Sequence, residues 1–173
     1  MSLERDLARL AQQEERLQFP SFDLHTAWKL GARLRALAAE RNLPVAIDIH
    51  LSGQQVFFAA LPGATPDNAE WVRRKRNVVQ RFHCSSYAMG LKLRQEGKTL
   101  AEPFALAACD YAAHGGCFPI RVQNTGVVGT VTVSGLPQRE DHDLLVEVLA
   151  ETLQQPLHEL ALEKNTAPAN SNE

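Results

Sequence analysis

Apolar residues recur every three or four positions in five stretches of this chain, a spacing that predicts amphipathic helices. The stretches cover residues 3 to about 17, 23 to 41, 65 to 82, 85 to 95, and 138 onward. In the second stretch, the apolar stripe expected to face a core consists of Leu24, Trp28, Leu34, Leu37 and Ala38.

Alternating apolar and polar residues predict two β-hairpins between these helices. The first pairs residues 45–51 with 55–61 across Ser52-Gly53-Gln54, and the second pairs 117–123 with 127–133 across a glycine-containing turn. Two hairpins separated by helices favour an antiparallel sheet with helices packed on it, an α+β layered fold. Residues 104–110 fit either a short helix or a buried connection.

Residues with special backbone preferences mark the ends of several elements. Thr65-Pro66-Asp67 combines a capping hydroxyl, a proline at the first helical position and an acid in the first turn, as at helix starts. Pro44 ends the second helix, because the residue before a proline avoids the α region. Pro156 is expected to kink or restart the last helix.

The length and composition are those of one ordinary globular domain. The 173 residues are 45% hydrophobic and 22% charged, which is enough chain to bury a core. We expect a single domain over residues 1–163 and a disordered tail over 164–173. The formal net charge of -2 argues against nucleic acid or an anionic membrane as a partner.

Features of the sequence point to the cytoplasm. The N-terminus is charged at once, which is not typical of a signal peptide, and no run approaches the roughly 18 apolar residues of a spanning helix. The three cysteines, Cys84, Cys109 and Cys117, are odd in number and lack metal or redox spacing. We expect Cys84 and Cys117 to be buried and free. No glycine-rich nucleotide fingerprint is present.

Three motifs, in this order and spacing, resemble the HbpS/GlcG-like ("haem-degrading" domain) superfamily, and more closely its uncharacterised bacterial and fungal branch. The resemblance covers residues from about 10 to 160. The motifs are Trp71 with Arg74-Lys75-Arg76-Asn77, Val79, Phe82 and Ser85-Ser86; His114-Gly115-Gly116 with Phe118-Pro119-Ile120; and Val133-Ser134-Gly135-Leu136-Pro137-Gln138 with Asp141-His142.

The resemblance implies a profilin-like, three-layer α/β/α domain around a five- or six-stranded antiparallel sheet. It also implies a homo-oligomer, a dimer or higher, because relatives form dimers that build larger assemblies. For some members it implies haem binding or haem breakdown.

Glycine-bearing strand ends and the start of the last helix form a corner that can hold a ligand. Backbone N–H groups at a helix N-terminus favour an anion, although acids already occupy this first turn. In the alternative interpretation the glycines serve turns and Asp141 caps or pins the neighbouring loop. The predicted ligand-binding residues are Lys75, Arg76, His114, Gly115, Gly116, Ser134, Gly135, Asp141 and His142.

The densest charge run, residues 73–76, favours a solvated helix face. Glu70 and Arg74 stand four apart with the acid first, which favours an ion pair on a helix. Lys75 or Arg76 can instead reach an acidic ligand or a subunit partner.

Other chemistries remain as alternatives. His114, Asp110, Asp141 and His142 offer metal-ligand atom types, but without a recognisable spacing, so we expect no metal. His114 and Asp141 would carry proton transfer in a small-molecule enzyme. Haem would need an axial ligand, for which His83, Cys84 and His114 are the available side chains.

The preferred hypothesis is a homo-oligomeric module that binds a small ligand such as an acidic metabolite, without demonstrated catalysis. No cofactor is expected under this hypothesis. A small-molecule enzyme and a haem-binding or haem-degrading protein are the alternatives, and whether the chain is an enzyme is left open.

Overall fold

The computed structural model describes residues 3–163, and the tail predicted over residues 164–173 lies outside the described residues. Its helices are α1 (Leu3–Arg16), α2 (Leu24–Glu40), α3 (Pro66–Phe82), α4 (Ser86–Glu96), α5 (Ala101–Phe104), α6 (Gln138–Thr152) and α7 (Leu157–Leu160). Its strands are β1 (Ala46–Leu51), β2 (Gln54–Ala60), β3 (Cys117–Val122) and β4 (Gly126–Ser134).

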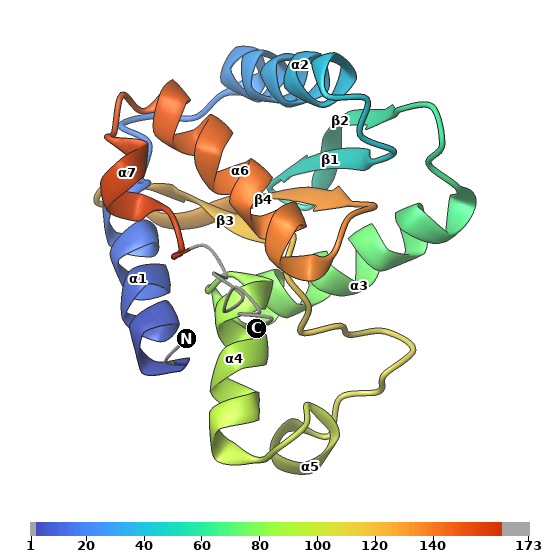
Figure 1. Cartoon of the computed structure of the whole chain (residues 1–173), viewed down its shortest axis with the longest axis vertical. Coiled ribbons are helices and arrows are strands. Elements are labelled where there is room, and N and C mark those ends of the chain that lie inside the picture. Colours follow the sequence, from blue (N-terminus) through green and yellow to red (C-terminus); the bar gives the residue numbers. More distant parts are fainter. Residues whose placement is uncertain (1–2, 164–173) are drawn as a thin grey trace, which may run out of the picture.

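The strands form one antiparallel sheet in the order β2-β1-β4-β3 (Figure 1). These strands are the two predicted hairpins, joined through the pairing of β1 with β4. The five or six strands implied by the family resemblance are wrong for the described residues, which form four. The remaining described segments are helices or connections, so the two alternating hairpins supply the whole sheet.

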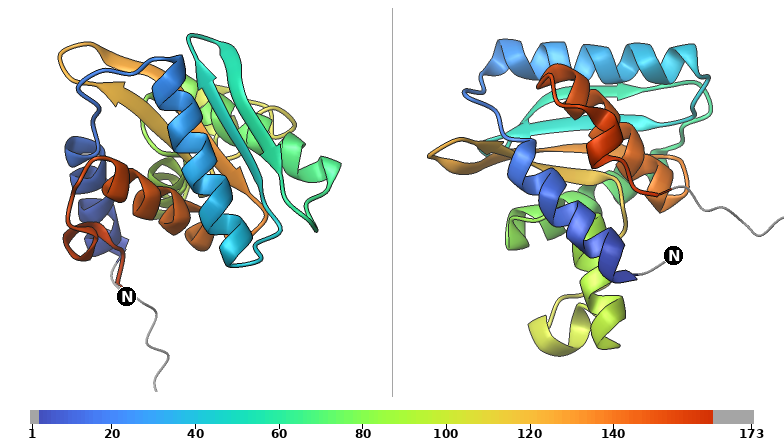
Figure 2. Two further views of the ribbon diagram at one scale, coloured as in Figure 1. Left: turned by 90° about the horizontal axis from the view of Figure 1, so that it is seen from above. Right: turned by 60° about the vertical axis from the view of Figure 1, so that its left-hand side comes forward.

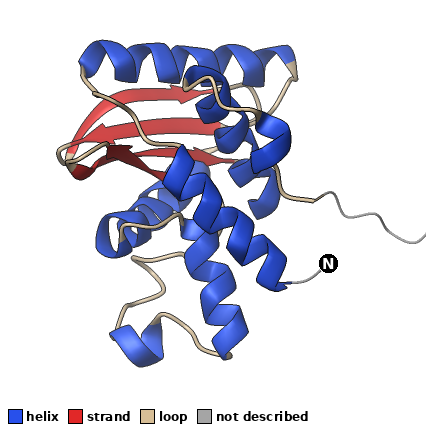
Figure 3. Ribbon diagram, turned by 90° about the vertical axis from the view of Figure 1, so that its left-hand side faces the viewer, coloured by secondary structure: helices blue, strands red, loops and turns tan. Residues whose placement is uncertain are grey.

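Helices cover both faces of the sheet (Figures 2 and 3). Ile47, Val131 and Phe118 point to one face and pack with α2 and α6 in the main hydrophobic core. Their neighbours Asp48 and Thr132 are also fully buried, but they point to the other face, which α3 covers. The sheet therefore has an apolar face and a polar face, and α3 lies over the polar one.

The predicted core stripe of α2 is correct in its second half and wrong in its first. Leu34, Leu37 and Ala38 are buried, whereas Leu24 and Trp28 are 63% and 62% exposed. The stripe instead continues back from Leu34 through Gly31, Leu30 and Ala27. Trp28 follows directly after Ala27 and is therefore turned about 100° around the helix from it.

The helix boundaries follow the predicted signals. Thr65 is the N-cap of α3, where its N–H donates to Asn68 Oδ1 at 2.7 Å, and proline occupies the first turn. The chain restarts as α7 directly after Pro156. Residues 104–110, which the sequence left open, end the short α5 and continue as a loop that buries Leu106. No helix within residues 3–163 is long and apolar enough to cross a membrane.

Candidate functional site

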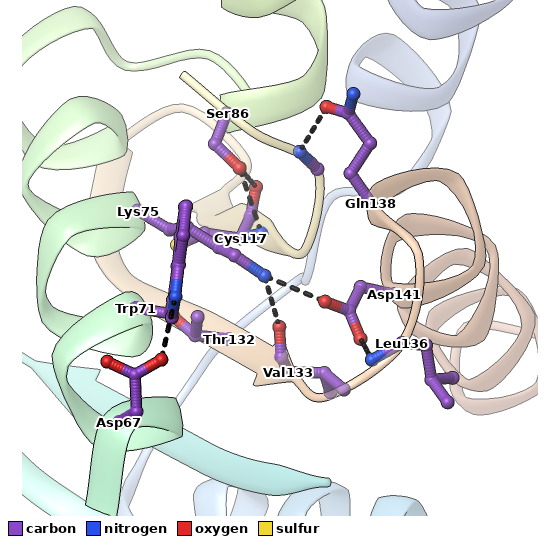
Figure 4. A network of polar contacts seen from close by, with 11 residues as sticks. Asp67, Trp71, Lys75, Ser86, Cys117, Thr132, Val133, Leu136, Gln138 and Asp141 are labelled. Atoms are coloured by element: carbon purple, nitrogen blue, oxygen red, sulfur yellow. Dashed lines mark hydrogen bonds and ion pairs between the residues drawn. The ribbon is translucent and has the colours of Figure 1, made fainter. Parts of the chain in front are cut away.

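An open hollow of about 250 Å³ lies where α3, the end of β4 and the first turn of α6 meet. Figure 4 shows side chains from these elements converging on it. The predicted residues in its wall are Lys75, His114, Ser134, Gly135 and Asp141. The wall is completed by Asp67, Asn68, Trp71, Leu136 and Gln138.

Gly115 and Gly116 lie beside the hollow and allow the chain to pack closely there. A Cβ on Gly115 would lie 2.0 Å from the carbonyl oxygen of Gln138. A Cβ on Gly116 would lie 2.4 Å from the carbonyl oxygen of Val133 and 2.6 Å from Lys75 Nζ. Both glycines are therefore required by the close approach of this loop to α3, β4 and α6.

The structure places two of the predicted residues away from the hollow. His142 is fully buried, and its Nε2 lies 2.8 Å from Gln13 Oε1 of α1. Arg76 bonds to Asp48 Oδ2 at 3.1 Å on the polar face of the sheet. Neither side chain lines the hollow, so both have structural partners inside the chain.

A buried ion pair closes the base of the hollow (Figure 4). Lys75 Nζ donates to Asp141 Oδ2 at 2.8 Å and to the carbonyl oxygen of Val133 at 3.0 Å, and the lysine is only 3% exposed. Asp141 Oδ1 accepts a bond from the Leu136 N–H at 3.0 Å, so Asp141 pins the neighbouring loop. Burial raises the pKa of the Asp141 carboxyl above its ordinary value, although the Lys75 ammonium opposes this shift.

Two amide side chains in the wall have their oxygen atoms already occupied. Asn68 Oδ1 accepts from the Thr65 N–H, and Gln138 Oε1 accepts from the Gly115 N–H at 3.2 Å. These bonds fix the orientation of both amides, so each NH2 group remains available as a donor. The wall therefore holds two oriented amide donors, beside the carboxylate of Asp67.

Trp71 and His114 form an aromatic part of the wall. Their ring centroids are 5.2 Å apart in an edge-to-face arrangement, and Trp71 Nε1 donates to Asp67 Oδ2 at 3.2 Å. Burial lowers the pKa of His114, and the positive charges of Lys75 and Arg74 lower it further. The His114 imidazole is therefore neutral at pH 7.

The basic run on α3 has its own partners. Glu70 pairs with Arg73 at 3.0 Å, not with Arg74 as predicted. Arg73 also pairs with Asp110 at 3.1 Å. The Arg74 guanidinium instead lies 4.6 Å from the centre of the Trp71 ring, a cation–π contact next to the hollow.

An apolar groove of about 420 Å³ adjoins the hollow, and His114 lines both. Leu93, Leu100, Leu106 and Tyr111 form much of the groove, with Arg74 also in its wall. Its chemistry suits a flat apolar group beside a neutral imidazole. The groove lies between α3, α4 and the loop that precedes β3.

The cysteines are poor ligands or nucleophiles. Cys84 and Cys117 are buried and free, as predicted. Burial raises the pKa of the Cys84 thiol to about 11 and that of Cys117 to about 12, so both stay protonated at neutral pH. Across residues 3–163, no three side chains of His, Cys, Asp or Glu converge as metal ligands would.

Five residues of the wall were not among the ligand-binding residues predicted from the sequence: Asp67, Asn68, Trp71, Leu136 and Gln138. The part of the wall on α3 could have been found, because Asp67, Trp71 and Lys75 are spaced four apart and so share one helix face. Leu136 and Gln138 belong to a motif of the family resemblance, but their place in the wall depends on how α6 packs beside α3.

Comparisons with known proteins point to one family. The family described as "Haem degrading protein HbpS-like" matches residues 22–150. A UPF0303 protein of Azotobacter vinelandii is 56% identical over 163 residues, covering 94% of this chain and 98% of its own. The crystal structure of the Ybr137w protein is 34% identical with a TM-score of 0.79, covering 86% of this chain and 87% of its own.

A further solved structure, a PduOC:haem complex, has a TM-score of 0.64 and covers 75% of this chain and 94% of its own. At 17% identity it shows likeness of fold alone.

Proposed function

The chain belongs to the HbpS-like family of haem-degrading proteins, and from this premise we propose that it is a homo-oligomeric module that binds a small organic acid in the hollow between α3 and α6. The observation that carries the proposal is the pair of free amide NH2 donors in the wall. The NH2 groups of Asn68 and Gln138 are available as donors, because the oxygen of each amide already accepts a bond within the chain and so fixes its orientation.

A ligand with several oxygen atoms matches such a wall. Carboxylate oxygens accept bonds from amide N–H groups, and the two amides come from α3 and α6, on different elements around the hollow. Lys75 uses two of its three N–H groups inside the chain and keeps one for a ligand. Trp71 offers an apolar surface for the carbon skeleton of the acid.

Catalysis by His114 and Asp141 would require a carboxylate that is free to act on the imidazole. Both carboxylate oxygens of Asp141 accept bonds from the protein, one from Lys75 and one from the Leu136 N–H. Asp141 therefore serves to hold Lys75 and the loop in place. Asp141 is therefore not free to act with His114 in proton transfer, as the alternative enzyme hypothesis requires.

Thermal unfolding in the presence of citrate tests the binding proposal. A ligand that binds the folded chain raises its melting temperature with concentration. We expect a saturable rise in the wild type, and a smaller one in Gln138→Ala. Gln80→Ala is the matched control, because Gln80 is exposed on α3 outside the hollow. An equal response of all three proteins to citrate, succinate and oxalate would refute the proposed site.

Haem is a second candidate ligand, favoured by the position of His114. Its neutral imidazole borders the apolar groove, and a neutral ring nitrogen is what an axial ligand to iron requires. Arg74, in the same wall, carries the charge that suits a propionate. Cys84 does not fit as a thiolate ligand, because its buried thiol stays protonated. Bound haem would supply iron-centred redox chemistry.

A hemin titration separates this candidate from the first. If His114 ligates the iron, the wild type shows a saturable Soret shift that His114→Ala loses. His83→Ala is the control and should keep the shift, because His83 is exposed at the end of α3 and lines neither cavity. A shift that survives in both variants would assign haem to another place.

A further inference from the structure

The two outer strands of the sheet differ in how their free edges are covered. The edge of β3 is bonded to the segment before α2: the Phe19 N–H donates to the Arg121 carbonyl, and the Gln123 N–H donates to the Phe19 carbonyl, at 2.8 and 2.9 Å. Pro119 also removes one donor from β3. In the described chain, β2 has a strand partner, β1, on one side alone (Figure 2).

The pairing with β1 tells which main-chain groups of β2 are free. The Leu61 N–H donates to the Val45 carbonyl at 3.0 Å, so Leu61 points its main-chain groups toward β1. Because these groups alternate along an antiparallel strand, the N–H and C=O groups of Ala60 and Phe58 point outward. The outer edge of β2 therefore presents a row of main-chain donors and acceptors.

The side chains of β2 do nothing to protect this row. Residues Gln54–Ala60 carry no charge and no proline, the two features that usually prevent strand edges from pairing with another chain. Phe58 is 47% exposed. On the other face of the sheet, Trp28 is 62% exposed and packs edge-on against Phe57, with ring centroids 5.7 Å apart. Apolar surface thus borders the free edge on both faces.

We propose that β2 pairs antiparallel with β2 of a second copy of this chain across a two-fold axis, which joins the two sheets into one. The free main-chain groups fit a strand, and an uncharged strand meets no charge repulsion when it pairs with itself. The outward N–H and C=O groups of Phe58 and Ala60 in one copy form hydrogen bonds with those of Phe58 and Ala60 in the other copy. Phe58 then lies opposite or diagonal to its counterpart, within side-chain contact.

This inference rests on the homo-oligomer in the proposed function, but it is independent of the ligand. No residue of β2 lines the hollow, so citrate binding and assembly are measured separately.

Charge substitutions at Phe58 test the interface through the molar mass in solution, measured by light scattering after size exclusion. We expect Phe58→Lys and Phe58→Glu each to have half the mass of the wild type or less. An equal mixture of the two should regain the wild-type mass, because Lys and Glu meet across the axis. Leu157→Lys is the control, since Leu157 is an exposed apolar residue on α7, and it should keep the wild-type mass.

Hydrogen exchange on the wild type gives a second readout that needs no variant. The outward amides of Phe58 and Ala60 should exchange slowly in the assembled protein, as amides inside a sheet do. Rapid exchange at both positions in an assembled wild type, or an unchanged mass in folded Phe58→Lys, would overturn the interface and leave the oligomer standing. A monomeric wild type would overturn the interface and the proposed oligomer together.

Discussion

Lys75 and Asp141 form the ion pair at the base of the hollow. Each was predicted from the sequence as a ligand-binding residue, but their pairing joins positions 66 apart and could not be predicted from spacing. Lys75 can be buried on α3 because its charge is matched by Asp141 and two of its three N–H groups are bonded inside the chain.

Lys75→Met should reduce the free energy of unfolding by about 3–5 kcal/mol, because it leaves the Asp141 carboxylate buried without its cation. Urea unfolding measures the loss. The double variant Lys75→Met/Asp141→Asn removes both charges and should be more stable than the sum of the two single losses predicts. Strict additivity would mean that the two side chains do not stabilise each other.

His142 gives the protein a defined dependence on pH. Burial lowers the pKa of His142 to about 3, and the charge of Arg139 acts in the same direction. Between pH 6.5 and about 3 the unfolded chain therefore binds a proton at His142 that the folded chain does not. Stability from the neutral ring is complete above pH 6.5 and is lost as the pH falls, by about 1.4 kcal/mol for each pH unit.

Urea unfolding of the wild type and His142→Gln at pH 7, 6 and 5 checks this slope. The wild type should lose more stability than the variant as the pH falls. Asp143 acts in the opposite direction, because burial raises its pKa to about 6 and its contribution is lost as the pH rises, but it is present in both proteins. Parallel pH profiles would show that His142 does not titrate as described.

At the scale of elements, the sequence pattern predicted the five long helices and both hairpins. Which residues are buried at the start of α2 could not be predicted from spacing. Trp28 fits the helical spacing, but it lies outside the stripe of α2 that contacts the sheet. The strand number shows the limit of family resemblance: the alternating residues predicted four strands, and the resemblance implied more.

The loop before β3 is fixed by steric fit to α6. Gly115→Ala should cost about 1–3 kcal/mol or more, because its Cβ would lie 2.0 Å from the main-chain oxygen of Gln138. Gly97→Ala is a useful comparison, because Gly97 has a positive φ of 64° and open space around it, so strain alone costs about 1–2 kcal/mol. Thermal unfolding of both variants compares the two costs. A Gly115→Ala protein as stable as the wild type would show that α6 moves freely away from this loop.

At the scale of the whole molecule, the two proposed roles have different places: ligand binding in the hollow, and self-association at the edge of β2. The end of β4 and the start of α6 lie together at the hollow, as the sequence indicated, because a short turn joins them. The α3 side of the hollow depends on how that helix crosses the polar face of the sheet, which no local pattern specifies. The proposed ligand site and the proposed assembly surface thus lie on different elements.

Fluorescence of Trp71 reports whether the hollow binds a small organic acid. The chain has two tryptophans, so Trp28→Phe leaves Trp71 in the wall of the hollow as the sole reporter. We expect a saturable change in Trp71 emission as citrate, succinate or oxalate is added, and a weaker change when Gln138→Ala is introduced into the same background. Emission that stays constant with all three acids up to millimolar concentrations would show that the hollow does not bind them.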